Sequence, residues 1–166
     1  MPLRSMLPWL GVAGMVILLD QLTKHWMQQI LSHGRSIELL PFFNLVLVYN
    51  PGAAFSLLSD QPGWQRSFFI AVAVLASSWV IYLLARYPGR RLFCFALALI
   101  LGGALGNLID RVVLGAVVDF VDLHVAGYHW PAFNVADSSI TCGAGLLILG
   151  SFRKDQGRAV SEAAIK

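Results

Sequence analysis

The sequence predicts an all-α integral membrane protein with four transmembrane helices and a small β-rich segment between the first and second helices, in a single domain over residues 1–166. This prediction rests on composition and on long apolar runs. Of the 166 residues, 57% are hydrophobic and only 13% are charged, whereas soluble domains carry about 25% charged residues. Four apolar runs approach the ~20 residues that a helix needs to cross ~30 Å of hydrocarbon. Such a chain cannot cover a water-facing surface.

The predicted spans cover residues 7–27, 67–86, 92–110 and 135–152. The first turns polar towards its end, at Asp20 and Lys24, and its apolar core is too long for a cleavable signal sequence. The third is rich in small residues, of which Gly103 and Gly106 would let another helix come close. The fourth carries Asp137 near its start. Ionisable side chains within membrane spans are costly, so these few are the first candidates for function.

Basic residues between the spans predict the orientation. Eight lie on the side of the termini: Arg4, Arg86, Arg90, Arg91, Arg153, Lys154, Arg158 and Lys166. Four lie on the other side: Lys24, Arg35, Arg66 and Arg111. Because cytoplasmic loops carry the excess of Lys and Arg, both termini are expected in the cytoplasm. Segments 28–66 and 110–134 then face outward, and both are longer than simple connectors.

The outward segment of approximately residues 36–60 is predicted to be β-rich. Alternation within residues 39–49 places four apolar side chains on one face: Phe43, Leu45, Leu47 and Tyr49. Asn50-Pro51-Gly52 predicts a turn, and residues 53–58 are expected to lie along the membrane interface. The alternative is a platform that only holds the helices together.

Two aspartates near the outer boundary are the candidate catalytic residues. Asp137 follows Asn134 by three residues, which is the spacing of a helix-capping box. Capping alone explains one carboxylate at a helix start, but it does not explain Asp119 in the apolar stretch 115–121. This stretch is expected to be a loop pressed against the membrane boundary. Two carboxylates on one outward face are what an aspartic hydrolase requires.

The chemistry of such a pair depends on proton sharing. Two carboxylates a few ångströms apart resist double ionisation, so one stays protonated while the other remains a base. The base takes a proton from an attacking water and the acid protonates the departing nitrogen of an amide. The two groups titrate as a unit, so the sequence does not assign the proton to either one.

The other charged residues of the spans have structural explanations. Asp20 lies four residues before Lys24, so the two are expected to form an ion pair along one helix face. Asp110 is expected to form a neutralised brace with Arg111, and Asn107 lies on a neighbouring surface of the same helix.

Other chemistries fit the sequence less well. A metal site would have to use Asp119, Asp122, His124 and His129. Their spacing matches no strong motif, and the two histidines, beside aromatic residues, are expected at the membrane interface. Ser138 and Ser139 have no evident paired histidine, and Cys142 is expected to be buried. We therefore expect no metal and no cofactor. The net charge of +3 comes without a dense basic stripe, which argues against nucleic-acid binding.

Five motifs in order along the chain carry a family resemblance. They are Asp20-Gln-Leu-Thr-Lys24, Asn50-x-Gly-Ala-Ala-Phe55, Gly102-Gly-Ala-Leu-Gly-Asn-Leu-Ile-Asp-Arg111, Val117-Val-Asp-Phe120 and Phe133-Asn-Val-Ala-Asp-Ser138. Together they resemble the bacterial lipoprotein signal peptidases over nearly the whole chain. The resemblance implies an aspartic endopeptidase of the bacterial inner membrane, with its site towards the periplasm. Its substrates would be lipid-modified prolipoproteins, cut before the cysteine that carries a diacylglyceryl group.

The resemblance also implies roles for individual residues. The catalytic pair falls on Asp119 and Asp137, and Asp20 falls on a structural position. Asp110 is the competing catalytic candidate, but a supporting role is favoured for it because Arg111 can hold it ionised. Residues that contact substrate or orient the carboxylates fall on Asn50, Asn107, Arg111 and Asn134. Pro51 departs from the family pattern and puts the local hydrogen bonding at Asn50 in doubt, because it lacks a backbone donor.

Two functions of other classes stay open at this point. A small transporter or channel subunit would use intramembrane carboxylates to relay protons or bind cations. A structural assembly subunit would use the small-residue face of the third span as its docking surface. The acidic residues gather on one side rather than along a path across the membrane, which favours the peptidase. We expect a monomer that contacts membrane lipids.

Overall fold

The computed structural model describes residues 3–31, 36–52 and 63–163. Its elements in chain order are η1 (Leu3–Ser5), α1 (Leu7–Ile30), β1 (Ile37–Leu40), β2 (Phe43–Asn50), α2 (Trp64–Arg86), α3 (Arg91–Val113), β3 (Val117–Val125), β4 (Tyr128–His129) and α4 (Val135–Ala163). The prediction for residues 53–58 lies outside the described residues. The fold is mostly helical, with a small antiparallel sheet.

Three helices of the described chain are long and apolar enough to cross a membrane. They are α2, α3 and the part of α4 from Val135 to Phe152, which correspond to the second, third and fourth predicted spans. Helix α1 is equally long, with 24 residues. Its second half carries Asp20, Gln21 and Lys24, which lower its mean hydropathy. Length and composition therefore do not identify α1 as a membrane-spanning helix.

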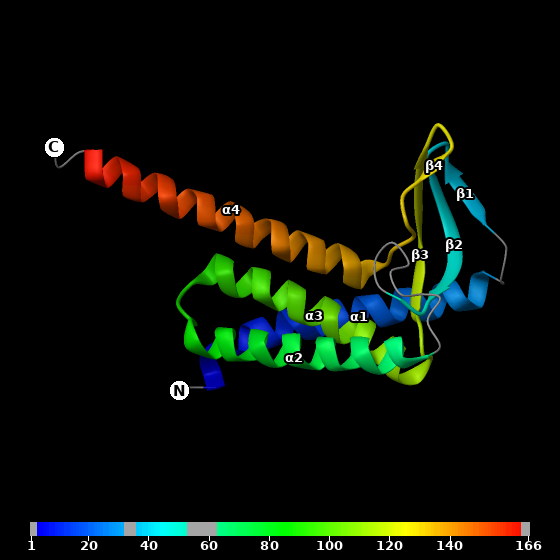
Figure 1. Ribbon diagram of the computed structural model, residues 1–166, viewed down its shortest axis with the longest axis horizontal. Helices are drawn as coiled ribbons and strands as arrows, with labels where there is room; N and C mark the ends of the chain where they lie inside the picture. The colour runs from blue at the N-terminus through cyan, green and yellow to red at the C-terminus, as the bar shows by residue number, and fades with distance from the viewer. Residues whose placement is uncertain (1–2, 32–35, 53–62, 164–166) are drawn as a thin grey trace.

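The helices run alternately in opposite directions, and the sheet stands across one end of them (Figure 1). Both chain ends lie at the opposite end of the bundle. Helix α3 is central because it packs against α1, α2 and α4. The hydrophobic core between α1, α2 and α3 is formed by Ala13, Val80, Leu84, Cys94, Leu97 and Leu101. The large apolar side chains on the outer helix surfaces are exposed, as expected of helices that face lipid.

Glycines explain how closely α3 approaches its neighbours. A Cβ atom added at Gly106 would lie 2.6 Å from Oδ2 of Asp20 in α1, and one added at Gly103 would collide with the backbone of Ala136 in α4. A side chain at Gly103 would require the backbone of α4 to move, and one at Gly106 would displace the carboxylate of Asp20. The predicted role of these two glycines is confirmed, and the consequence is that polar groups of three helices are brought together near one end.

The sheet has the order β1-β2-β3-β4 with antiparallel pairing. The predicted face of β2 is confirmed for Leu45, Leu47 and Tyr49, which pack against an apolar cluster from the end of α1 and from β3. That cluster contains Met27, Leu31, Leu47, Val118 and Phe120. The packing fixes the sheet to the end of the helical bundle.

The prediction of a loop around Asp119 was wrong. Residues Val117–Val125 form strand β3, in which Val48 of β2 is the partner of Asp119. The stretch is rich in β-branched residues and finds a partner strand in β2, so its backbone groups are satisfied by the sheet rather than by water. Asp119 is therefore held by a strand, beside an irregularity in the pairing of β2 with β3.

Candidate active site

A cavity of about 630 Å³ lies where the sheet meets α3 and α4. Its lining consists of Asn50, Asn107, Arg111, Val117, Asp119, Trp130, Pro131, Ala132, Phe133, Asp137, Ser138, Ile140, Thr141 and Cys142. Both candidate catalytic aspartates belong to it, together with three of the five residues predicted to support them. A few polar groups on one mostly apolar wall are typical of a binding site.

Asp137 is placed by the start of α4. The Asn134 side-chain Oδ1 accepts a hydrogen bond from the Asp137 backbone N–H at 2.9 Å. In return, the Asn134 backbone N–H donates to Asp137 Oδ2 at 3.3 Å. This reciprocal pair is the predicted capping box. The other oxygen, Oδ1, accepts a hydrogen bond of 2.8 Å from Asn107 Nδ2 of α3, so the capping carboxylate is also tied to the neighbouring helix.

Asp119 is placed by β3 and held by two asparagines. Asn134 Nδ2 donates to Asp119 Oδ1 at 2.7 Å, and Asn50 Nδ2, from the end of β2, donates to Oδ2 at 3.2 Å. Only 2% of the residue is exposed. Asn50 Oδ1 accepts the Gly52 N–H at 3.0 Å, which confirms the predicted turn and shows that Pro51 leaves the hydrogen bonding of Asn50 intact.

Asn134 links the two aspartates. Its backbone and Oδ1 cap α4 at Asp137, while its Nδ2 reaches Asp119 and lies 3.2 Å from Asn107 Oδ1. The residue is fully buried. One asparagine therefore contacts both carboxyl-bearing residues, one through the helix cap and one through its amide.

The environment of Asp119 favours its protonated form. Burial, followed by the negative charge of Asp137, raises the pKa of Asp119 to about 7. The hydrogen bonds from Asn50 and Asn134 and the charge of Lys24 oppose this shift. At neutral pH the group thus exists in both protonation states, as an acid–base pair requires.

Arg111 lies beside the pair but does not brace Asp110 as predicted. Its Nη2 donates to the Gly52 carbonyl at 3.0 Å, and its guanidinium lies over the ring of Phe69, 5.2 Å from the centroid. Among the described side chains, Lys24 is the ion-pair partner of Asp110. Adjacent residues of a helix point about 100° apart, so Asp110 and Arg111 face different neighbours.

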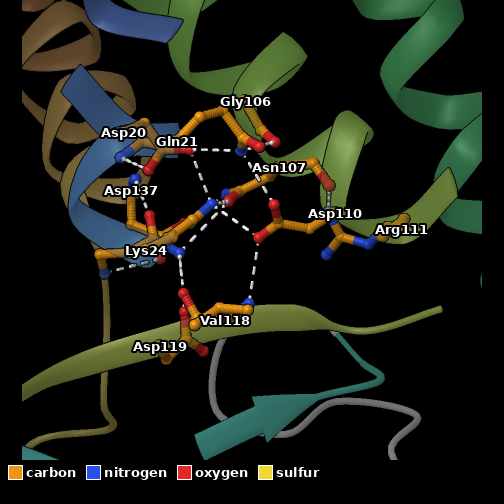
Figure 2. Close-up of polar contacts among 12 residues, drawn as sticks. Asp20, Gln21, Lys24, Gly106, Asn107, Asp110, Arg111, Val118, Asp119 and Asp137 are labelled. Atoms are coloured by element: carbon orange, nitrogen blue, oxygen red, sulfur yellow. Dashed lines mark hydrogen bonds and ion pairs between the residues drawn. The ribbon is translucent and has the colours of Figure 1, made fainter. Parts of the chain in front are cut away.

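A buried polar network lies behind the cavity (Figure 2). The predicted pair of Asp20 and Lys24 is confirmed, with 2.8 Å between Oδ2 and Nζ. Lys24 Nζ also lies 2.8 Å from Asp110 Oδ2 and donates to Asn107 Oδ1 at 2.9 Å. The predicted intrahelical pair is thus only part of a larger network. Sequence spacing within α1 does not indicate which residues of α3 lie opposite Lys24.

Gln21 was not predicted to belong to this network. Its Nε2 donates to Asp110 Oδ1 at 2.9 Å, to Asp20 Oδ2 at 3.2 Å and to the Gly106 carbonyl at 3.2 Å. The signal that could have found it is its place between Asp20 and Lys24 in the polar end of an otherwise apolar helix. Three amide contacts across α1 and α3 make it part of the same network.

The four residues considered for a metal site do not converge. Asp119 lines the cavity together with Asp137, whereas Asp122 does not line it and is bound by Asn44 instead. Asp122 binds His129 at 2.9 Å, and the rings of His124 and His129 stack with centroids 4.9 Å apart. Within residues 3–31, 36–52 and 63–163, no group of three or more His, Cys, Asp or Glu side chains is arranged for a metal ion.

Two neighbouring residues of α4 bear on nucleophilic chemistry. The prediction that Cys142 is buried was wrong: it is exposed and lines the cavity, because it lies on the same face of α4 as Ser138. The Ser138 hydroxyl donates to the Asn134 carbonyl at 3.0 Å, as expected of a serine in a first helical turn.

These features define a class of protein. The fold is that of a helical membrane protein, and the cavity is lined by one buried and one half-buried carboxylate, those of Asp119 and Asp137. Comparisons with known proteins identify the family. The family model described as signal peptidase (SPase) II matches residues 12–153.

Relatives and solved structures agree with this match. The chain is 56% identical to a lipoprotein signal peptidase of Janthinobacterium sp. (strain Marseille), over 90% of this chain and 91% of that protein. It is 58% identical to one from Ralstonia nicotianae, over 89% and 85% of the two chains. A solved bacterial membrane enzyme superposes with a TM-score of 0.81 at 33% identity, covering 90% of both chains. The chain belongs to the signal peptidase II family and is a membrane-embedded peptidase.

Proposed function

We propose that this chain is an intramembrane aspartic endopeptidase that removes signal peptides from diacylglyceryl-modified prolipoproteins, cutting on the N-terminal side of the lipidated cysteine. The observation that carries this proposal is the convergence of Asp119 and Asp137, from a strand and a helix start, on one cavity. The names of the relatives, which are lipoprotein signal peptidases, supply the substrate class.

The proposed reaction uses one carboxyl as base and the other as acid. The ionised member of the pair takes a proton from a water molecule as the water oxygen attacks the scissile carbonyl carbon. The protonated member then gives its proton to the amide nitrogen as the C–N bond breaks. The products are a carboxylic acid on the signal peptide, which then releases its proton to solvent, and a free amine on the cysteine, and the pair is left with one proton, as it began.

Supporting residues hold this arrangement in place. Asn50 and Asn134 orient the two oxygens of Asp119, and Asn107 orients Asp137. Arg111, whose guanidinium lies at the cavity beside Phe69, is placed to contact the substrate backbone. The fixed hydrogen bonds mean that little reorganisation is needed as charge moves in the reaction.

The position of the cavity suits a lipid-anchored substrate. Each methylene of the diacylglyceryl chains stabilises membrane insertion by ~0.8 kcal/mol, so the scissile bond must be cut at membrane depth. The cavity wall includes Trp130, Pro131, Phe133 and Ile140, which offer apolar contacts next to the carboxylates. The sheet beside it would position the peptide.

We propose that α1 also crosses the membrane, so that the protein has four spans in the bacterial inner membrane. The alternation of helix directions and the placement of both chain ends opposite the sheet support four crossings (Figure 1). The excess of Arg and Lys on the side of the termini supports a cytoplasmic location for them, and hence a periplasmic site. The buried charged side chain of α1, Lys24, faces α3 rather than lipid, as its contacts with Asp110 and Asn107 indicate. We further propose that the enzyme acts as a monomer.

The test is cleavage of a purified, diacylglyceryl-modified prolipoprotein, with the cut site read by mass spectrometry. We expect one cut, directly before the lipidated cysteine, and none in the unmodified precursor. Asp137→Asn is expected to abolish the cut in protein that still inserts and folds. Cleavage elsewhere in the chain, or full activity of Asp137→Asn, would contradict the proposal. Proton flux through vesicles that contain the protein would instead favour a transporter.

A further inference from the structure

Three buried charges form a triad beneath the cavity. The ammonium of Lys24 lies 2.8 Å from a carboxylate oxygen of Asp20 and 2.8 Å from one of Asp110, and the three side chains are between 0% and 4% exposed. Such triads are a weak source of stability, because well-packed apolar residues of similar volume often replace them without loss. What else the two carboxylates bind is therefore informative.

The remaining hydrogen bonds of the triad run to two particular backbone positions. Asp20 Oδ1 accepts the N–H of Ala136 at 2.9 Å. Asp110 Oδ2 accepts the N–H of Val118 at 3.1 Å (Figure 2). Ala136 directly precedes Asp137, and Val118 directly precedes Asp119. The two arms of one triad therefore reach the chain one residue before each member of the aspartate pair.

We propose that the triad of Asp20, Lys24 and Asp110 is a positioning device that sets the separation of the two catalytic carboxylates through these two backbone hydrogen bonds. The inference rests on the proposed function for the aspartate pair. None of the three residues lines the cavity, so each acts through the backbone and not on the substrate.

The separation of the pair needs such a device because its members come from different elements. Asp119 belongs to β3 and Asp137 to α4, whereas both anchors come from α1 and α3. Gln21 fixes the anchors to each other, since its amide donates to Asp110 Oδ1 and Asp20 Oδ2. Gly106 packs against Asp20 Oδ2 and leaves that carboxylate no room to move towards α3.

Lys24 adds a third arm to the device. Besides holding the two anchors, its ammonium donates to Asn107 Oδ1 at 2.9 Å, and Asn107 Nδ2 donates to Asp137 Oδ1 at 2.8 Å. The amide of Asn107 is thereby oriented with its nitrogen towards the catalytic carboxylate. A misplacement of about 1 Å in such a constellation can reduce the rate by about 100-fold.

Matched variants separate anchoring from charge. Asp110→Asn and Asp110→Ala both remove the charge, but only asparagine keeps a carbonyl oxygen that can accept the Val118 N–H. Asp20→Asn and Asp20→Ala make the same comparison for Ala136. We expect kcat to fall about 100-fold in the alanine variants and less than about 10-fold in the asparagine variants. KM should stay within about 2-fold in all four, because the triad does not touch substrate.

Asp122→Asn is the control, since it removes a carboxylate from β3 that has no contact with the triad. Equal kcat values for the alanine and asparagine variants would overturn the inference, and so would a rise in KM at unchanged kcat. The Asp20 arm and the Asp110 arm are independent tests. If the alanine variant of one arm does not fold, the variants of the other arm still test the inference. Leucine variants, which match aspartate in size and also lack an acceptor, replace the alanines if both fail.

A measurement without substrate keeps this inference separate from the proposed function. The infrared band of the protonated carboxyl of the pair can be titrated with pH in the resting protein. Because mutual repulsion falls as the carboxylates separate, its midpoint should lie lower in the alanine variants than in the asparagine variants. Equal midpoints would overturn the inference even where cleavage cannot be measured, whereas absence of cleavage by the wild type would count against the proposed function alone.

Discussion

Asp119 and Asp122 lie three residues apart on β3, and their neighbours shift the pKa values of the two carboxyls in opposite directions. Burial and the charge of Asp137 raise the pKa of Asp119 to about 7. Burial also acts to raise the pKa of Asp122, but hydrogen bonds from His129 and Asn44 outweigh it and lower that pKa. Two aspartates of the same strand therefore differ because of the side chains that surround them. Those surrounding side chains decide whether a carboxyl can act as an acid at neutral pH.

The largest expected difference between the two aspartates is in catalysis. Asp119→Asn should reduce the cleavage rate by at least about 1,000-fold, because an amide can neither accept nor supply the shared proton. Asp122→Asn should change it by less than about 3-fold, because Asp122 is held by Asn44 and His129 and does not line the cavity. A cleavage assay on both variants, with membrane insertion verified, checks this. Comparable losses of cleavage rate in the two variants would mean that both carboxylates of β3 are needed, and that the position of Asp119 at the cavity does not distinguish it.

A smaller effect is expected from the amides that hold the two carboxylates. Asn134→Ala removes the cap of α4 and the 2.7 Å hydrogen bond to Asp119, so kcat should fall about 100-fold and the apparent unfolding temperature by several degrees. Asn44→Ala removes only a hydrogen bond to Asp122 and should leave kcat nearly unchanged. Steady-state kinetics and thermal unfolding of the two variants test the contrast. Equal effects on kcat would refute it.

The pH profile should respond to Asn50 in a defined direction. The rate of the wild type is expected to decline as the pH rises through about 7, because the pair then loses its shared proton. The hydrogen bond from Asn50 lowers the pKa of Asp119, so Asn50→Ala should move this decline to higher pH. The ratio of rates at pH 8 and pH 6 measures the shift. A shift to lower pH would show that Asn50 stabilises the protonated form.

The smallest effect concerns stability. Folding raises the pKa of Asp119 from 3.8 to about 7, so the folded state binds more protons than the unfolded state in this window and stability falls as the pH rises through it. Asp122 has a lowered pKa, so its contribution is present at neutral pH and is lost in acid. At pH 8, Asp119→Asn should therefore unfold about 2–4 °C above the wild type and Asp122→Asn slightly below it. The reverse order would contradict the assigned environments.

The local parts of the site could be predicted from the sequence. The capping box of Asn134 and Asp137 follows from a three-residue spacing, and the pair of Asp20 and Lys24 follows from a four-residue spacing on a helix. The close approach of α3 to its neighbours follows from its glycines. The prediction that Asp119 is catalytic depended on two signals, the unusual position of a carboxylate in an apolar stretch and the family resemblance.

The long-range parts could not be predicted. The ion pair between Lys24 and Asp110 depends on the register of α1 against α3, which neither helix encodes alone. The strand around Asp119 depends on pairing with β2, about 70 residues earlier in the chain, and the apolar stretch by itself fits a boundary loop equally well. The exposure of Cys142 depends on which face of α4 the cavity occupies. In each case the missing information is the position of a second element.

The most direct test of the central claim is an infrared pH titration of the wild-type protein labelled at aspartate. A proton held between Asp119 and Asp137 predicts a protonated-carboxyl band that persists to a midpoint of about 7 and disappears in Asp119→Asn. Loss of every protonated-carboxyl band by about pH 5, near the ordinary range of aspartate, would show that the two residues ionise independently and would contradict the account.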